Sequence, residues 1–150
     1  YGGFVHRRAQ GVLVFSADNT LTNGDTSGRY AKTQTMNSAL ADRFARVIEF
    51  KYLSKDQEVE ALTLHTGCSK QLAGHVVDAI NVARSKVATG DVIDAPSIRS
   101  ALAFIRALSV LSVDEAWETT ITSRQPEEGR PALDAIKTAF ISADFINKHL

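Results

Sequence analysis

The chain has 150 residues, 44% of them hydrophobic and 23% charged, and its 17 Lys and Arg equal its 17 Asp and Glu in number. This balance argues against electrostatic capture of nucleic acid or of an anionic membrane, and no apolar run approaches the roughly 18 residues that cross a bilayer. The single cysteine, Cys68, excludes an internal disulfide framework and a multi-thiolate zinc site. The opening residues lack the charged-then-apolar order of a signal peptide, so we expect a cytoplasmic protein. The length suits one ordinary domain, or a half-domain with a small companion.

The first third of the chain predicts two strands with a short helix between them. Residues 12–15 form a continuous apolar run, which is typical of a strand buried on both faces of a parallel sheet. A polar loop follows up to residue 28, then a short helix over about 35–45, and residues 47–53 alternate as a second strand does. Two strands alone make a poor sheet. We therefore expect the other strands of this sheet to lie outside the chain.

From Ser54 onward the sequence predicts helices only. Ser54 and Gln57 have the spacing of a capping box, in which each side chain accepts a hydrogen bond from the other residue's backbone. This first helix is expected to end at Gly67, which suits the left-handed position after a helix. Ser69 is expected to cap a second helix that ends near Gly90.

Three more helical patterns follow. Pro96 is expected in the first turn of a helix whose apolar residues include Ile98 and Leu108. Residues 112–115 form a second capping box, which opens a helix that contains Trp117. Residues 125–130 are expected to form a loop, and a last helix is expected to run from Pro131 to about Ile146.

Four motifs of the chain resemble those of AAA+ ATPases, most closely the MoxR proteins and the ATPase subunit of cobaltochelatase. Residues 17–28 (Ala-Asp-Asn-Thr to Gly-Asp-Thr-Ser-Gly) are similar to the family's Ala-Asn-Thr loop and its Gly-Asp-Thr-Thr-Gly sequence. Residues 41–44 (Ala-Asp-Arg-Phe) are similar to the Leu-Asp-Arg-Phe segment, and Tyr52 and Leu53 to the family's Asn-Tyr-Leu. Residues 96–99 (Pro-Ser-Ile-Arg) are similar to its Ser-Pro-Arg sequence, offset by one residue.

The resemblance implies a fold of the class α/β plus all-α. Residues 1–53 are then the distal part of the AAA+ α/β subdomain, with the C-terminal strands of its parallel sheet, and residues 54–150 are a helical lid. The resemblance covers nearly the whole chain and is most specific over residues 12–54. Beyond about residue 110 it consists of helical pattern alone.

The resemblance also implies roles for three residues. Asn19 matches sensor 1, whose amide orients the water that attacks the γ-phosphate; without the resemblance it is a polar residue at the end of a strand. Arg43 matches the arginine finger, which neutralises charge on a neighbouring subunit's nucleotide, with Arg46 as the alternative. Arg99 matches sensor 2, which contacts the phosphates from the lid, with Arg106 as the alternative.

The chain lacks the motif that holds ATP in this family. No glycine is followed by lysine, so the P-loop (Walker A) sequence is absent. Residues 110–115 imitate a Walker B motif, but their position downstream of Arg99 favours the capping box. We therefore expect ATP and Mg²⁺ to bind to an intact protein and not tightly to this chain alone, which should be inactive. Either the chain is an excerpt of a longer polypeptide or a partner supplies the missing part.

The implied function is ATP hydrolysis in a ring of about six identical subunits, which remodels a partner such as a metal-inserting chelatase complex or a von Willebrand A-domain protein. The alternative from another class is a non-catalytic helical protein-interaction module, in which Asn19, Arg43 and Arg99 only cap helices and form ion pairs. The four histidines are scattered and Cys68 lacks an activating base, so we expect no metal site and no thiol nucleophile.

Overall fold

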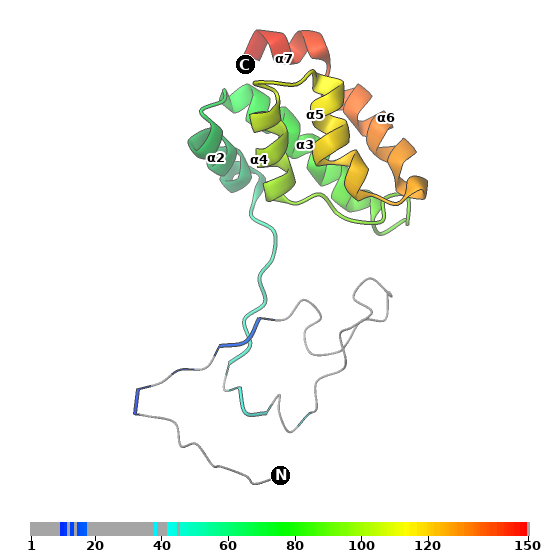
Figure 1. The fold of residues 1–150 in the computed structure, drawn as a ribbon. Helices are drawn as coiled ribbons and strands as arrows, with labels where there is room; N and C mark the ends of the chain where they lie inside the picture. The colour runs from blue at the N-terminus through cyan, green and yellow to red at the C-terminus, as the bar shows by residue number, and fades with distance from the viewer. Residues whose placement is uncertain are drawn as a thin grey trace. The chain divides into compact units, whose positions relative to one another are not determined.

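The computed structural model describes residues 10–11, 13, 15–17, 38, 42–44 and 46–149. The chain divides into two compact units, Tyr1–Lys51 and Tyr52–Leu150. The helices of the second unit are seen together in Figure 1.

The described residues of the first unit contain no strand. Leu13 and Phe15, from the first predicted strand, are unpaired and 74% and 86% exposed. Residues 47–53, the second predicted strand, are all described and also lack strand structure. The predicted helix over 35–45 lies largely outside the described residues. Among those that are described in this range, Ser38 is helical, and Asp42 and Arg43 form a turn.

The predicted fold class, an AAA+ parallel sheet followed by a lid, is therefore wrong. A strand is stable only when its backbone groups pair with a neighbouring strand. The apolar side chains of residues 47–53 are instead exposed, with Phe50 at 92%. The described part of the chain is helical and has no strand to pair with them.

The second unit begins with two helices that pack against each other. Helix α2 (Lys55–Thr66) starts at the predicted capping box and ends at Gly67, which has a φ of 74°. Helix α3 (Lys70–Lys86) is capped by Ser69, whose side chain accepts a hydrogen bond from the backbone of Leu72. Helix α3 ends with a turn over residues 87–90. Both predicted helices are confirmed, with the second ending at Lys86 and not at residue 90.

Helices α4 (Ile98–Ala107) and α5 (Val113–Thr120) pack against each other and begin at serine caps. Ser97 caps α4, so Pro96 lies before the helix and not in its first turn as predicted. The second capping box, between Ser112 and Glu115, is confirmed at the start of α5. Two 3-10 turns, η1 (Thr122–Arg124) and η2 (Glu127–Gly129), occupy the predicted loop region.

The predicted last helix is two helices, α6 (Arg130–Phe140) and α7 (Ala143–His149). The break occurs at Ile141, whose backbone (φ −125°, ψ 82°) is outside the helical region. Ser142 then accepts a hydrogen bond from the backbone of Phe145, 3.2 Å away, in the manner of an N-cap. The break lets α7 turn back against α3, where Phe145 contacts the ring of His75.

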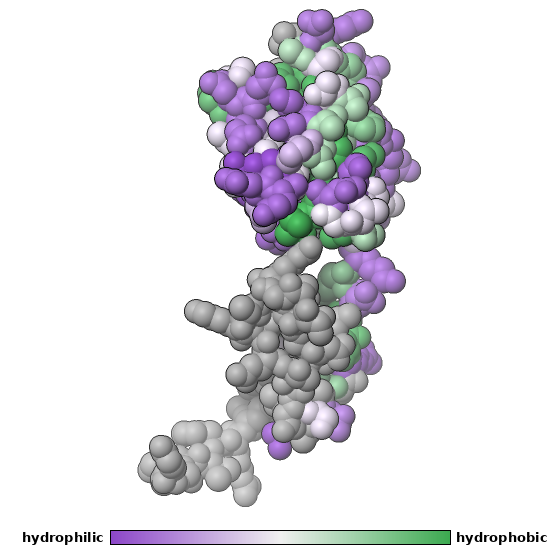
Figure 2. Space-filling model, turned by 90° about the vertical axis from the view of Figure 1, so that its right-hand side faces the viewer, coloured by the Kyte–Doolittle hydropathy of each residue, from purple (hydrophilic) through white to green (hydrophobic). Residues whose placement is uncertain are grey.

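One apolar core holds the helices of this unit together. Helix α3 lies at its centre and contacts α2, α4, α6 and α7, and Figure 1 shows α4 and α5 in front of it. Trp117 and Phe104 are fully buried and meet edge to face, with ring centroids 5.5 Å apart. Outside this core, hydrophilic side chains cover much of the face seen in Figure 2. Within the described range no helix is both long and apolar enough to span a membrane.

Two glycines of this unit should respond to alanine in opposite ways. Gly67 has a positive φ, so Gly67→Ala is expected to destabilise the fold by about 1 kcal/mol through backbone strain. Gly74 lies inside α3 with open space around its Cα, so Gly74→Ala should stabilise the fold by about 0.5–1 kcal/mol through helix propensity. Urea unfolding measures the change in the free energy of unfolding for each variant. Changes of the same sign would contradict the two assigned backbone positions.

Candidate functional site

The residues predicted to act together are distributed over both units. Asn19 lies outside the described residues. Arg43 is exposed in a turn of the first unit, and Arg46 is exposed in the segment that follows. Arg99 and Arg106 belong to α4 of the second unit. The structure therefore describes the surroundings of each arginine within its own unit.

Arg99 lies in the first turn of α4 with its side chain exposed. The turn is ordered by Ser97, whose hydroxyl accepts a hydrogen bond from the backbone of Ser100 at 3.4 Å. No acidic residue occupies this turn, as in α3 and α6 and unlike the first turns of α2 and α5. The guanidinium of Arg99 has no hydrogen bond or ion pair with any described residue. An unpaired cation therefore adds to the positive end of the helix dipole, which favours an anion nearby.

Arg106, the alternative to Arg99, is placed differently. It lies in the last turn of α4, where a cation is favoured by the negative end of the helix dipole. Its side chain is exposed and donates a hydrogen bond to the carbonyl of His65, 3.4 Å away. The ordinary structural role of a basic residue at a helix C-terminus accounts for this position.

A hollow of about 240 Å³ lies beside the start of α4. Its lining residues come from the segment before α4, its first turn, and the end of α5 with η1: Asp94, Ala95, Pro96, Ser97, Ser100, Ile121, Arg124 and Gln125. The buried amide of Gln125 closes one side by bonding both backbone groups of Asp94; its oxygen accepts from the amide of Asp94, 2.9 Å away. The segment that leads into α4 is thereby fixed from the side of η1.

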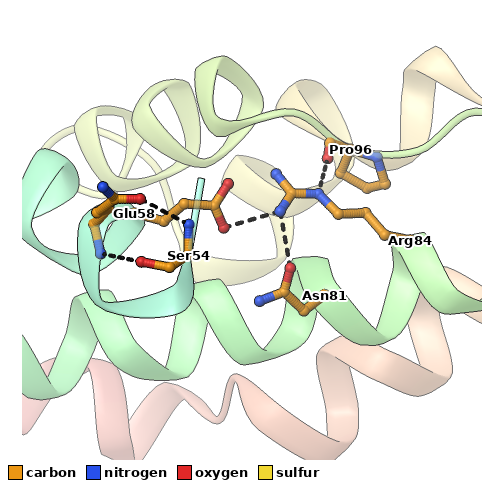
Figure 3. A network of polar contacts seen from close by, with 6 residues as sticks. Ser54, Glu58, Asn81, Arg84 and Pro96 are labelled. Atoms are coloured by element: carbon orange, nitrogen blue, oxygen red, sulfur yellow. Dashed lines mark hydrogen bonds and ion pairs between the residues drawn. The ribbon is translucent and has the colours of Figure 1, made fainter. Parts of the chain in front are cut away.

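The most ordered polar cluster of the unit is centred on Arg84, and the sequence did not predict it. Figure 3 shows its guanidinium between α2, α3 and the segment before α4. The Nη1 atom donates to Glu58 Oε2 at 2.9 Å and to Asn81 Oδ1 at 2.8 Å, and Nε donates to the carbonyl of Pro96 at 3.0 Å. The side chains of Arg84 and Glu58 are 8% and 2% exposed, so the pair is buried.

An aromatic ring covers this buried pair. The guanidinium carbon of Arg84 lies 4.0 Å from the ring centroid of Tyr52, within the range of a cation–π contact. The Nη2 atom is buried and finds no acceptor among the described residues. A signal in the sequence could have indicated the pair. Glu58 precedes the buried Leu62 by four residues and Arg84 follows the buried Ile80 by four, so both charges fall on the apolar faces of their helices.

Several other ionisable groups of the described residues are paired, part of a helix cap or buried. None of them forms a cluster of three or more His, Cys, Asp or Glu side chains. Asp114 pairs with Lys137 at 2.6 Å, and Glu115 closes the capping box, so the Walker B imitation is part of a helix start. Cys68 is buried. This arrangement of described residues presents cationic and hydrogen-bonding groups rather than an acid–base pair.

The capping box of α5 should be visible in a carboxylate titration. Hydrogen bonds from the hydroxyl and then the backbone N–H of Ser112 hold the pKa of Glu115 below its ordinary value. Ser112→Ala should therefore raise the pKa of Glu115, measured by NMR titration of its carboxyl carbon. Because the folded-state pKa is depressed, this group stabilises the fold above its unfolded pKa, and the contribution is lost as pH falls through the folded value.

Asp91 serves as the internal control for this titration. Its pKa is lowered by a hydrogen bond from Thr89 and by Lys86, and neither residue contacts Ser112. Ser112→Ala should leave the pKa of Asp91 where it is. An unchanged pKa of Glu115 in the same sample would show that the capping box does not form in solution.

Removing one partner of the buried Arg84–Glu58 pair should destabilise the unit strongly. Arg84→Met leaves the buried carboxylate of Glu58 without its partner, so we expect a loss of about 3–5 kcal/mol. The double variant Glu58→Leu/Arg84→Met removes both charges and should recover most of that loss. As a control, Lys55→Met breaks an exposed pair with Asp78 and should cost less than about 1 kcal/mol. Urea unfolding measures all three, and equal losses for Arg84→Met and Lys55→Met would show that the pair is not buried in solution.

Comparison with described protein families, curated proteins and solved structures finds no match to this chain.

Proposed function

We propose that this chain is the C-terminal portion of an AAA+ ATPase similar to the MoxR proteins and the ATPase subunit of cobaltochelatase. The observation that carries the proposal is the state of Arg99, which is exposed and unpaired among the described residues in the first turn of α4. Because no described residue pairs with this guanidinium, a phosphate can reach it without displacing a described partner. A phosphate satisfies both the guanidinium and the end of the helix.

In the proposed function, ATP and Mg²⁺ bind between identical subunits of a ring in the cytoplasm. Arg99 contacts the phosphates of its own subunit's nucleotide, and Asn19 orients the attacking water. Arg43 reaches the nucleotide of the neighbouring subunit, for which its exposed position in a turn leaves it free. Hydrolysis then drives the remodelling of a protein partner, for which a chelatase complex or a von Willebrand A-domain protein is the candidate that the resemblance suggests.

A second candidate is the non-catalytic helical interaction module. It is favoured by the run of exposed large apolar side chains just before α2: Val47, Ile48, Phe50, Tyr52 and Leu53. Such a run in water is typical of a protein-contact surface. In this module the arginines have no role in turnover.

The test is the ATPase turnover of the native polypeptide that contains this chain, over a concentration series that spans assembly. Arg43→Ala should lower turnover by on the order of 10³-fold, because the finger stabilises charge in the transition state. Arg99→Ala should weaken ATP binding and lower turnover as well. Lys70→Ala is the matched control, since Lys70 is an exposed cation in the first turn of another helix, and it should leave turnover unchanged.

Mixing two kinds of subunit distinguishes an arginine finger that acts on the neighbouring subunit from a general loss of activity. Subunits that carry an intact Arg43 but an inactive P-loop should restore part of the turnover of Arg43→Ala subunits. Turnover that is absent from the native polypeptide, or that is unaffected by both arginine changes, would reject the ATPase proposal. The interaction module would then be the better account.

A further inference from the structure

Arg99 is presented by a turn whose approach is held by Arg84. The Nε atom of Arg84 donates to the carbonyl of Pro96, three residues before Arg99. Between them, Ser97 caps α4 by accepting from the amide of Ser100, and its carbonyl accepts from the amide of Ala101 at 3.2 Å. A displacement of the Pro96 carbonyl therefore displaces the cap that fixes the turn of Arg99.

The same guanidinium contacts the first residue of the helical unit. Tyr52 follows directly on Lys51, the last residue of the first unit, and its ring lies over the guanidinium carbon of Arg84. Tyr52 is 61% exposed, so the stacking contact is not enclosed by the core and can change without unfolding it. Arg84 connects the two, since its guanidinium contacts the Tyr52 ring and donates to the Pro96 carbonyl just before α4.

The chemistry of the guanidinium makes it suited to transmit such a change. It is planar and rigid, so its hydrogen-bond directions move together. Its Nη1 atom donates hydrogen bonds to Glu58 and Asn81. Its Nε atom donates to the carbonyl of Pro96, and the Tyr52 ring stacks on its planar face. A change in the ring position therefore tilts the plane about its anchored nitrogen and alters the bond to Pro96.

We propose that Arg84 is a positioning residue that couples the junction at Tyr52 to the turn of α4 that carries Arg99. The consequence for catalysis rests on the proposed function: a movement at the junction between the two units adjusts how Arg99 meets a phosphate. The coupling itself is a property of the helical unit and is measured without nucleotide.

The experiment is a double-variant cycle on the full chain, read by backbone hydrogen exchange. Tyr52→Ala should speed exchange of the Ser100 and Ala101 amides by about two- to five-fold, the factor that corresponds to an exposed cation–π contact. The same change made in the Glu58→Leu/Arg84→Met background should have no effect on these amides, because the intermediate group is gone. That background contains no unpaired buried charge and is expected to fold.

Three comparisons separate coupling from general loosening. Tyr52→Phe keeps the ring and should leave exchange unchanged, and so should Phe50→Ala, a change at a more exposed neighbouring ring. The Glu115 and Ala116 amides, held by Ser112 in an equivalent cap on α5, should also be unchanged. The coupling is overturned if the α4 amides do not respond to Tyr52→Ala, if they respond equally in both backgrounds, or if the α5 amides speed up to the same extent.

Nucleotide turnover then separates this proposal from the proposed function. A positive exchange cycle in a native polypeptide whose turnover is insensitive to Arg99→Ala rejects the role in ATP hydrolysis and leaves the coupling supported. A negative cycle in a polypeptide that needs Arg99 for turnover rejects the coupling alone.

Discussion

The buried ion pair between Arg84 and Glu58 is a constraint that joins separate segments of the helical unit. Removing two charges from water costs several kcal/mol for each ion, so the pair is stable only when its remaining groups are satisfied. Asn81 and the Pro96 carbonyl supply further hydrogen bonds, and they come from α3 and from the segment before α4. The bonds of Nη1 and Nε therefore fix three parts of the chain relative to one another, while Nη2 has no acceptor among the described residues.

Most helix starts could be predicted because their causes are local. Ser54, Ser69 and Ser112 each accept a hydrogen bond from a backbone amide three residues later, and this interaction is encoded within four residues. Ser97 makes the same bond to Ser100 but was missed, because Pro96 was placed inside the helix. The break at Ile141 was missed because neither glycine nor proline marks it, and the apolar repeat continues through it. Ser142 was the available signal, since a serine inside a helical pattern can cap a new helix.

The wrongly predicted strand over residues 47–53 and the missed polar cluster have a common cause. The alternation of apolar and polar residues over 47–53 predicts which side chains would share a face of a strand. A strand also needs a neighbouring strand to pair with, and a local pattern does not indicate whether one exists. Arg84 and Glu58 lie 26 residues apart, and each alone is an ordinary charged residue on a helix. Their meeting depends on how α2 packs against α3. Arg99 was chosen by its motif and its role stays a prediction, whereas its exposure and its lack of a partner among the described residues required the structure.

Arg84 and Arg99 show why burial and pairing, rather than residue type, distinguish a structural arginine from an available one. Arg84 is buried with its charge opposed by Glu58, so binding an added anion there would require breaking bonds that hold three segments. Arg99 gives up no described hydrogen bond when it binds an anion, and its helix end already favours negative charge. An exposed arginine on a flexible turn would lose conformational freedom on binding, which weakens the contact. On our proposal that Arg99 meets a phosphate, the held carbonyl of Pro96 and the Ser97 cap would reduce that loss by ordering the backbone of the turn in advance.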